Sequence, residues 1–100
     1  MLTKTEVIQF LKANSQHFKN QYGISKVAIF GSYASDTASQ ESDIDLIVDL
    51  DQPLGFKFYS FIEEIENSLN KKVDVLTMDG INSIRSEKIK TNIKQSMEYV

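Results

Sequence analysis

Three short apolar runs, separated by stretches with helical spacing, restrict the fold of this chain more than any other feature of its sequence. The runs cover residues 26–30, 44–50 and 73–77. A continuous apolar run of this length is typical of a strand that is covered on both faces. Gly31-Ser32 directly follows the first run and predicts a turn or a short helix, whereas residues 35–42 are polar and predict a loop.

The segments around these runs have the spacing of amphipathic helices. Thr3 and Glu6 fit a capping box, which predicts a helix from about 3 to 20 that ends at Tyr22-Gly23. Pro53 fits the first position of a second helix, with Lys71 and Lys72 near its C-terminal end, where the helix dipole favours positive charge. Asp79-Gly80 predicts a turn, and Ser83 fits the N-cap of a last helix. The apolar positions are Phe58, Phe61, Ile62, Ile65 and Leu69 in the second helix and Ile84, Ile89, Ile93 and Met97 in the last.

This alternation predicts an α/β (α+β) fold in which helices pack on a small mixed β-sheet. We expect a single domain over residues 1–100, because that length supports one core. The net charge of −3 disfavours a dedicated nucleic-acid binder, so no direct nucleic-acid partner is expected. The absence of cysteine excludes disulfides and thiolate metal sites and is compatible with a cytoplasmic protein. We predict no signal peptide and no membrane partner, because no apolar run approaches the required length.

Asp43 and Asp45 are the firmest candidates for chemistry. Side chains alternate between the two faces of a strand, so these two carboxylates point the same way, with Cα atoms about 6.6 Å apart. Two carboxylates at that separation can share one cation, and hard oxygen ligands suit Mg²⁺. The residues between and after them, Ile44, Leu46 and Val48, face the opposite side and would anchor the strand to the core.

Gly31-Ser32 and Asp74 complete the candidate site. A glycine at a strand end lets a ligand approach the backbone closely, and a serine at a helix start can bind a phosphate. Asp74 reaches the same place if the third strand lies beside the second. A third carboxylate can hold a second metal ion or act as a general base. Taken singly, each element has a plainer interpretation: a turn, a solvated strand face or a salt-bridge partner.

The joint pattern resembles a known family. Phe30-Gly31-Ser32, ten residues, and then Asp43-Ile44-Asp45 are similar to the signature of the DNA polymerase β-like nucleotidyltransferase superfamily. The longer segments 29–34, 42–49 and 72–77 resemble its minimal nucleotidyltransferase (MNT) family, and the similarity extends to a final helix ending at 98–100. One position departs from the family pattern: members often carry Arg, a possible phosphate or structural contact, where this chain has Ser35.

The resemblance implies a nucleotidyltransferase fold and the transfer of AMP from ATP to a hydroxyl, with release of pyrophosphate. It implies that Gly31 and Ser32 grip the triphosphate, that Asp43 and Asp45 bind Mg²⁺, and that Asp74 completes the triad. It further implies an MNT-type antitoxin that is paired with a HEPN-domain toxin and acts by adenylylating a toxin tyrosine, by binding, or both.

Three functions follow from these expectations. The first is Mg²⁺-dependent transfer of AMP to a protein hydroxyl, since 100 residues leave no second domain to hold an antibiotic or a tRNA. The second is a non-catalytic antitoxin that neutralises its toxin by binding. The third is a small-molecule, aminoglycoside-type nucleotidyltransferase that acts as a homo-oligomer, with acceptor residues from the second subunit.

Overall fold

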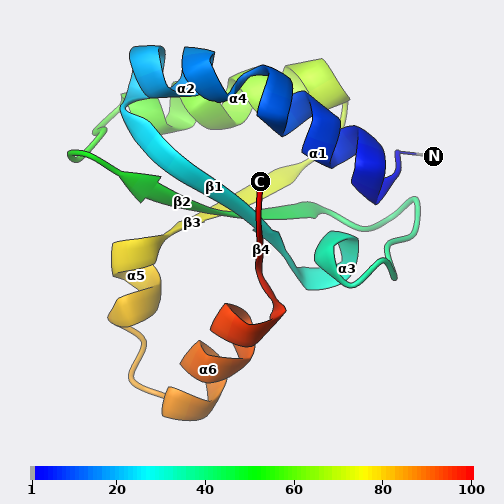
Figure 1. The fold of residues 1–100 in the computed structure, drawn as a ribbon, viewed down its shortest axis with the longest axis vertical. Coiled ribbons are helices and arrows are strands. Elements are labelled where there is room, and N and C mark those ends of the chain that lie inside the picture. Colours follow the sequence, from blue (N-terminus) through cyan, green and yellow to red (C-terminus); the bar gives the residue numbers. More distant parts are fainter. Residues whose placement is uncertain (1) are drawn as a thin grey trace.

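A computed structural model describes residues 2–100 and contains one mixed sheet with helices on both faces (Figure 1). The strands are β1 (Ile24–Phe30), β2 (Ile44–Leu50), β3 (Val73–Thr77) and β4 (Glu98–Tyr99). Their order across the sheet is β3-β2-β1-β4. Strand β2 is antiparallel to β1 and parallel to β3, and β4 is antiparallel to β1 on its other edge. The predicted α/β class and the three predicted strands are therefore confirmed.

The larger core lies between the sheet and helices α1 (Lys4–Ala13), α2 (Ser15–Tyr22) and α4 (Lys57–Leu69). An aromatic cluster joins α2 to α4, since the ring centroids of Phe18 and Phe61 are 5.1 Å apart and those of Tyr22 and Phe61 are 5.4 Å apart. The sheet contributes fully buried side chains to this core, as predicted for β2; they are Ile29, Ile44, Leu46 and Val48.

A smaller core covers the opposite face of the sheet. Ala28 and Ile47 are buried there against Ile81 of helix α5 (Met78–Asn82), with helix α6 (Glu87–Ser96) packed alongside. Helix α3 (Gly31–Ala34) follows β1 directly, as the Gly31-Ser32 pair predicted. Because this second core leaves one end of the sheet face uncovered, polar side chains have room there.

The helix predicted over 3–20 is two helices. The Thr3 capping box is present, and the segment ends at Tyr22 with Gly23 in the left-handed region. At Asn14, however, the backbone leaves helical geometry, and its side-chain amide donates to the carbonyl of Phe10 over 2.9 Å. This local capping bond competes with the helical hydrogen bonds, which explains the break.

Three further boundary predictions were wrong. Pro53 lies in the loop before α4, which begins at Lys57. Asp79-Gly80 lies within α5 because Thr77 caps that helix, and Ser86, not Ser83, caps α6 by accepting from the backbone N–H of Ile89. Within residues 2–100, no helix is long and apolar enough to cross a membrane.

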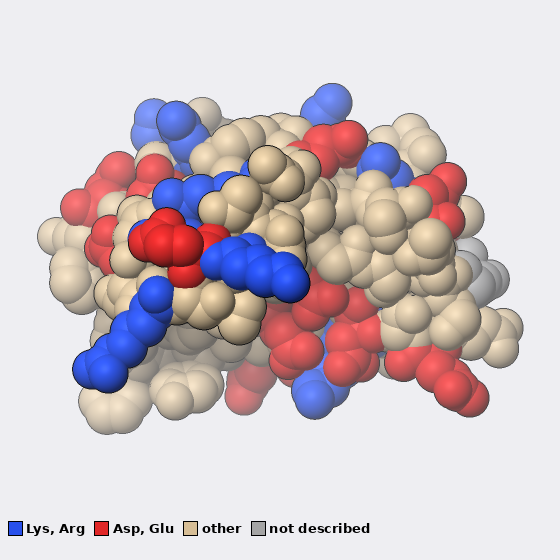
Figure 2. All heavy atoms as spheres, turned by 90° about the horizontal axis from the view of Figure 1, so that it is seen from below, with Lys and Arg blue, Asp and Glu red and all other residues tan. Residues whose placement is uncertain are grey.

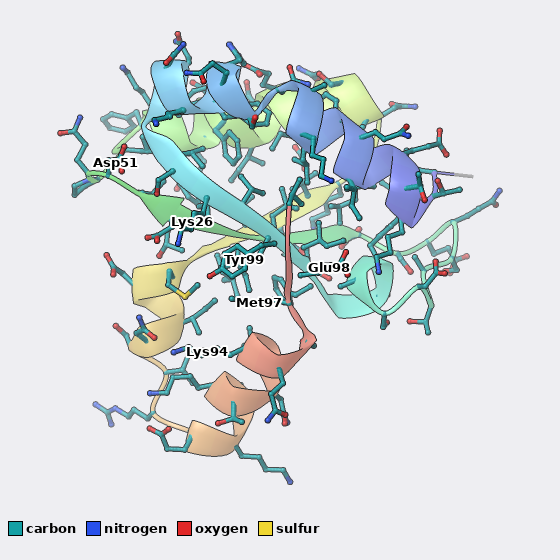
Figure 3. All side chains as sticks on the ribbon, in the orientation of Figure 1. Lys26, Asp51, Lys94, Met97, Glu98 and Tyr99 are labelled. Carbon is teal, nitrogen blue, oxygen red and sulfur yellow. The ribbon has the colours of Figure 1, made fainter. Side chains whose placement is uncertain are left out.

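The chain end is a strand and not the predicted end of a helix. Glu98 and Tyr99 form β4, opposite Ile29 and Ala28 of β1. Figure 3 shows the two side chains on opposite sides of β4. Glu98 pairs with Lys4 of α1 at 3.4 Å, and the Tyr99 ring lies 5.8 Å from the ammonium of Lys26. The edge of β1 therefore determines the conformation of this segment.

We predict that Phe61→Ala lowers the free energy of unfolding by about 3–5 kcal/mol, because it leaves a cavity between α2 and α4. Phe61 is completely buried, whereas Tyr59 on the same helix is 68% exposed. Urea denaturation checks this prediction, with Tyr59→Ala expected to change stability by less than about 0.5 kcal/mol. Similar losses in the two variants would contradict the assigned packing of α4.

Candidate active site

Strand β2 directs the first two aspartates to one face of the sheet. Asp43 immediately precedes β2 and Asp45 is its second residue. Ile44 and Leu46 are fully buried in the larger core, so the alternation of the strand places Asp45 on the opposite face, with Ile47 further along. The structure thus gives Asp43 and Asp45 the common orientation expected from strand parity.

Strand β3 supplies the third aspartate. It lies beside β2 in parallel, with Asp74 directly opposite Asp45 and Val73 opposite Ile44. The strand neighbour on which the prediction for Asp74 depended is therefore present. Asp45 is partly buried and Asp74 is exposed, so the pair lies at the surface of the sheet face.

The backbone of Gly31 lies against the carboxylate of Asp45. Phe30 at the end of β1 is paired with Asp45, and Gly31 follows with a φ of +70°. A Cβ atom added at Gly31 would collide with the Asp45 carboxylate. Glycine is required here twice: for the left-handed backbone and for the close approach of a carboxylate.

Ser32 lies in the first turn of α3, beside this contact. Its carbonyl accepts from the backbone N–H of Thr37 at 2.9 Å, which folds the following loop back onto α3. Ser35 also stabilises this loop: its hydroxyl lies 3.3 Å from the Ser32 carbonyl and 2.8 Å from the Thr37 hydroxyl. The position thus stabilises a turn and brings no positive charge.

The neighbouring aspartates act electrostatically on Asp45. Partial burial raises the pKa of Asp45 above its ordinary value, and the negative charges of Asp74 and then Asp43 raise it further. Figure 2 shows the molecule from below, where acidic side chains gather right of centre next to basic ones. The site therefore favours a bound cation or a proton over three free negative charges.

Lys72 is a member of this site that the sequence did not reveal. Its ammonium lies 3.9 Å from an Asp43 carboxylate oxygen. The sequence pattern places Lys72 near the C-terminal end of the preceding helix. Its position two residues before Asp74, which gives both the same strand parity, is the signal that identifies it.

The donor set fits a divalent cation that is only partly held by protein. Within residues 2–100, no three acidic, histidine or cysteine side chains gather closely enough to hold a metal ion by themselves, and this includes the three aspartates. Mg²⁺ typically takes one or two carboxylates and completes its shell with phosphate oxygens and water. Asp45, with Asp43 along the strand and Asp74 across it, offers hard oxygen ligands of that kind on an open face.

Three cavities of the described residues lie away from these aspartates. One of about 530 Å³ is formed by the loop after β2 and the start of α4, one of about 410 Å³ lies between the end of α2 and the same loop, and one of about 290 Å³ lies between α2 and the edge of β1. None of the three is lined by Asp43, Asp45 or Asp74. The chemistry-bearing side chains therefore stand on an accessible face and not inside these cavities.

Comparison with known proteins places the chain among nucleotidyltransferase domains. Residues 7–100 match the family described as "Nucleotidyltransferase domain". The chain is 33% identical over 103 aligned positions to the protein MJ1379 of Methanocaldococcus jannaschii, with all of both chains covered. It is also 31% identical over 84 residues to "Protein adenylyltransferase MntA" of Thermococcus cleftensis, covering 83% of this chain and 85% of that protein. The chain belongs to the nucleotidyltransferase domain family and is an enzyme of the nucleotidyltransferase class.

Solved structures share the fold. A chain of a toxin–antitoxin complex with AMP-PNP superposes with a TM-score of 0.65 at 20% identity, over 98% of this chain and 72% of that one. A chain from a complex of the tri-AMPylated Shewanella oneidensis HEPN toxin with its MNT antitoxin gives 0.56 at 18% identity, over 96% and 66%. At these identities the likeness concerns the fold.

We predict that Gly31→Ala lowers the rate of nucleotidyl transfer about a hundredfold, because the new Cβ displaces the Asp45 carboxylate. The matched control is Gly23→Ala, since Gly23 has a φ of +68° but open space around its Cβ position. Both variants should lose about 1–2 kcal/mol of stability from the left-handed backbone. Transfer assays alongside thermal unfolding separate the two effects; equal activity losses would refute the contact with Asp45.

We predict that Asp45→Asn stabilises the metal-free protein at neutral pH, by less than about 1 kcal/mol because water screens a partly exposed group. The raised pKa means that the folded protein keeps the Asp45 proton to higher pH than the unfolded chain. Stability therefore falls as pH rises from 3.8 through the raised pKa, and the asparagine variant lacks this fall. Thermal unfolding in EDTA across this range is the measurement. Asp49→Asn removes a charge on the same strand away from the trio and should retain the fall.

Proposed function

We propose that this chain transfers AMP from ATP, with Mg²⁺, to a hydroxyl of a protein, and that residues 1–100 act as one catalytic domain. The observation that carries the proposal is the position of Asp45, which lies against Gly31 on one side and opposite Asp74 on the neighbouring strand. The relative named protein adenylyltransferase MntA supports adenylyl transfer as the reaction.

The residues divide the proposed reaction between them. Gly31 and Ser32 orient the triphosphate, and Asp43 and Asp45 hold the cation. Bound Mg²⁺ supplies neutralisation of the charge on the phosphates. Asp74 accepts the proton of the attacking hydroxyl. The bond from that oxygen to the α-phosphorus forms in line with the bond to pyrophosphate that breaks, so the products are an AMP ester and pyrophosphate.

We further propose that the acceptor is a HEPN-domain toxin and that the chain is its antitoxin. The support comes from the complex that contains an AMPylated HEPN toxin and an MNT antitoxin with the same fold. The open face around Asp74 also suits a protein acceptor, because such an acceptor brings its own surface to enclose the reacting groups.

We expect the chain, with ATP and Mg²⁺, to add adenylyl groups to a HEPN-domain toxin that it neutralises. Intact-mass spectrometry of that protein detects each addition. Asp43→Asn or Asp74→Asn should reduce transfer about a hundredfold or more, because each removes a charge-stabilising or proton-accepting group. Asp49→Asn is the matched control and should transfer normally.

The same assay separates catalysis from masking. A triple variant of Asp43, Asp45 and Asp74 to asparagine should bind the toxin but fail to modify it. If wild type adds no adenylyl group and the triple variant neutralises the toxin equally well, the proposal of protein adenylylation is wrong and neutralisation occurs by binding.

A further inference from the structure

Lys72 and the three aspartates lie where β2 and β3 begin. Asp45 lies opposite Asp74 in the register of the two strands. Asp43 and Lys72 directly precede β2 and β3, and the backbone N–H of Ile44 donates to the carbonyl of Lys72 over 3.0 Å, which ties Lys72 to the start of β2. One face therefore carries three carboxylates and one ammonium at neighbouring positions.

The contact between Lys72 and Asp43 is long and open to solvent. The ammonium lies 3.9 Å from the carboxylate oxygen, and the two side chains are 68% and 41% exposed. An exposed pair of this kind contributes little to stability, so either partner can be replaced by a stronger ligand. Lys71 differs, because its ammonium is fixed on the Gln40 carbonyl at 2.7 Å.

The charges around Asp43 explain why binding of a cation would release Lys72 from it. Within residues 2–100, Lys72 is the cationic side chain that lies within 4.0 Å of the aspartate trio. A divalent cation bound at Asp43 competes with this ammonium for the carboxylate, because the two positive charges repel each other at short range. A triphosphate bound to that cation brings new anionic oxygens to the place where the ammonium is released.

We propose that Lys72 is a binding residue that pairs with Asp43 before a cation binds and moves to the polyphosphate of ATP when a divalent cation occupies the aspartates. This inference rests on the proposed function, because it concerns the same site. The ammonium supplies three donors as a point charge, which suits an exposed phosphate. It provides the positive charge that Ser35 does not.

The proposal predicts opposite changes in two affinities. Lys72→Gln removes a competitor for Asp43, so Mg²⁺ alone should bind about two- to fivefold more tightly. The same variant loses a charged contact with the nucleotide, so MgATP should bind about tenfold more weakly. Lys72→Arg keeps the charge and should stay within about threefold of wild type for both ligands. Damage to the fold would weaken the binding of both Mg²⁺ and MgATP, and would therefore be distinguished from the opposite changes predicted here.

The test titrates the whole chain with MgCl₂ by NMR, following the amide signals of residues 43–45 and 72–74, and then with MgATP by calorimetry without an acceptor. Lys71→Gln is the matched control and should change neither affinity. Unchanged or weaker Mg²⁺ binding in Lys72→Gln, or unchanged MgATP binding, would overturn the exchange. Because no transfer is measured, the inference can stand if adenylylation fails, and it can fail while adenylylation stands.

Discussion

Strand β2 holds Asp45 in place from the opposite face of the sheet, where Ile44 and Leu46 are completely buried. Turning the strand over, so that Asp45 faced away from this side of the sheet, would require those two side chains to leave the larger core, at a cost of several kcal/mol. The backbone of Gly31 lies against the Asp45 carboxylate and limits its movement in that direction. The Asp45 carboxylate therefore stays at a position where burial and two neighbouring negative charges disfavour its ionised form. The apolar packing on one face of the strand is what keeps the like charges close together on the other face.

This arrangement explains why the sheet is covered unevenly. The face with Ile44 and Leu46 is packed under α1, α2 and α4, whereas α5 and α6 cover only the middle of the other face. A helix over Asp45 would desolvate it further and would block access to a cation. A site of this kind therefore needs a strand with one core-facing side and one partly open side, and the stability must come from the larger core.

The sequence predicted the parts of the site that strand alternation determines. Asp43 and Asp45 face one way because Ile44 and Leu46 must face the other, and this depends on a single strand. The place of Asp74 depended on which strand lies beside β2, which no local pattern specifies. Lys72 was missed for the same reason. The break at Asn14 depends on a side-chain cap, and the strand at Glu98–Tyr99 depends on pairing with the edge of β1. Both interactions override the local helical spacing of the sequence.

The exposure of the site bears on the kind of acceptor it can use. Asp74 is exposed, and Asp43 and its lysine partner reach into solvent. In water, a charged transition state gains little from fixed charges, so catalysis requires that water be excluded when the reaction occurs. A small acceptor such as a sugar leaves this face open unless a second subunit covers it. A folded protein that presents its hydroxyl on a surface covers the face as it binds, so substrate binding itself would complete the low-dielectric environment that Asp45, Asp74 and the bound cation need.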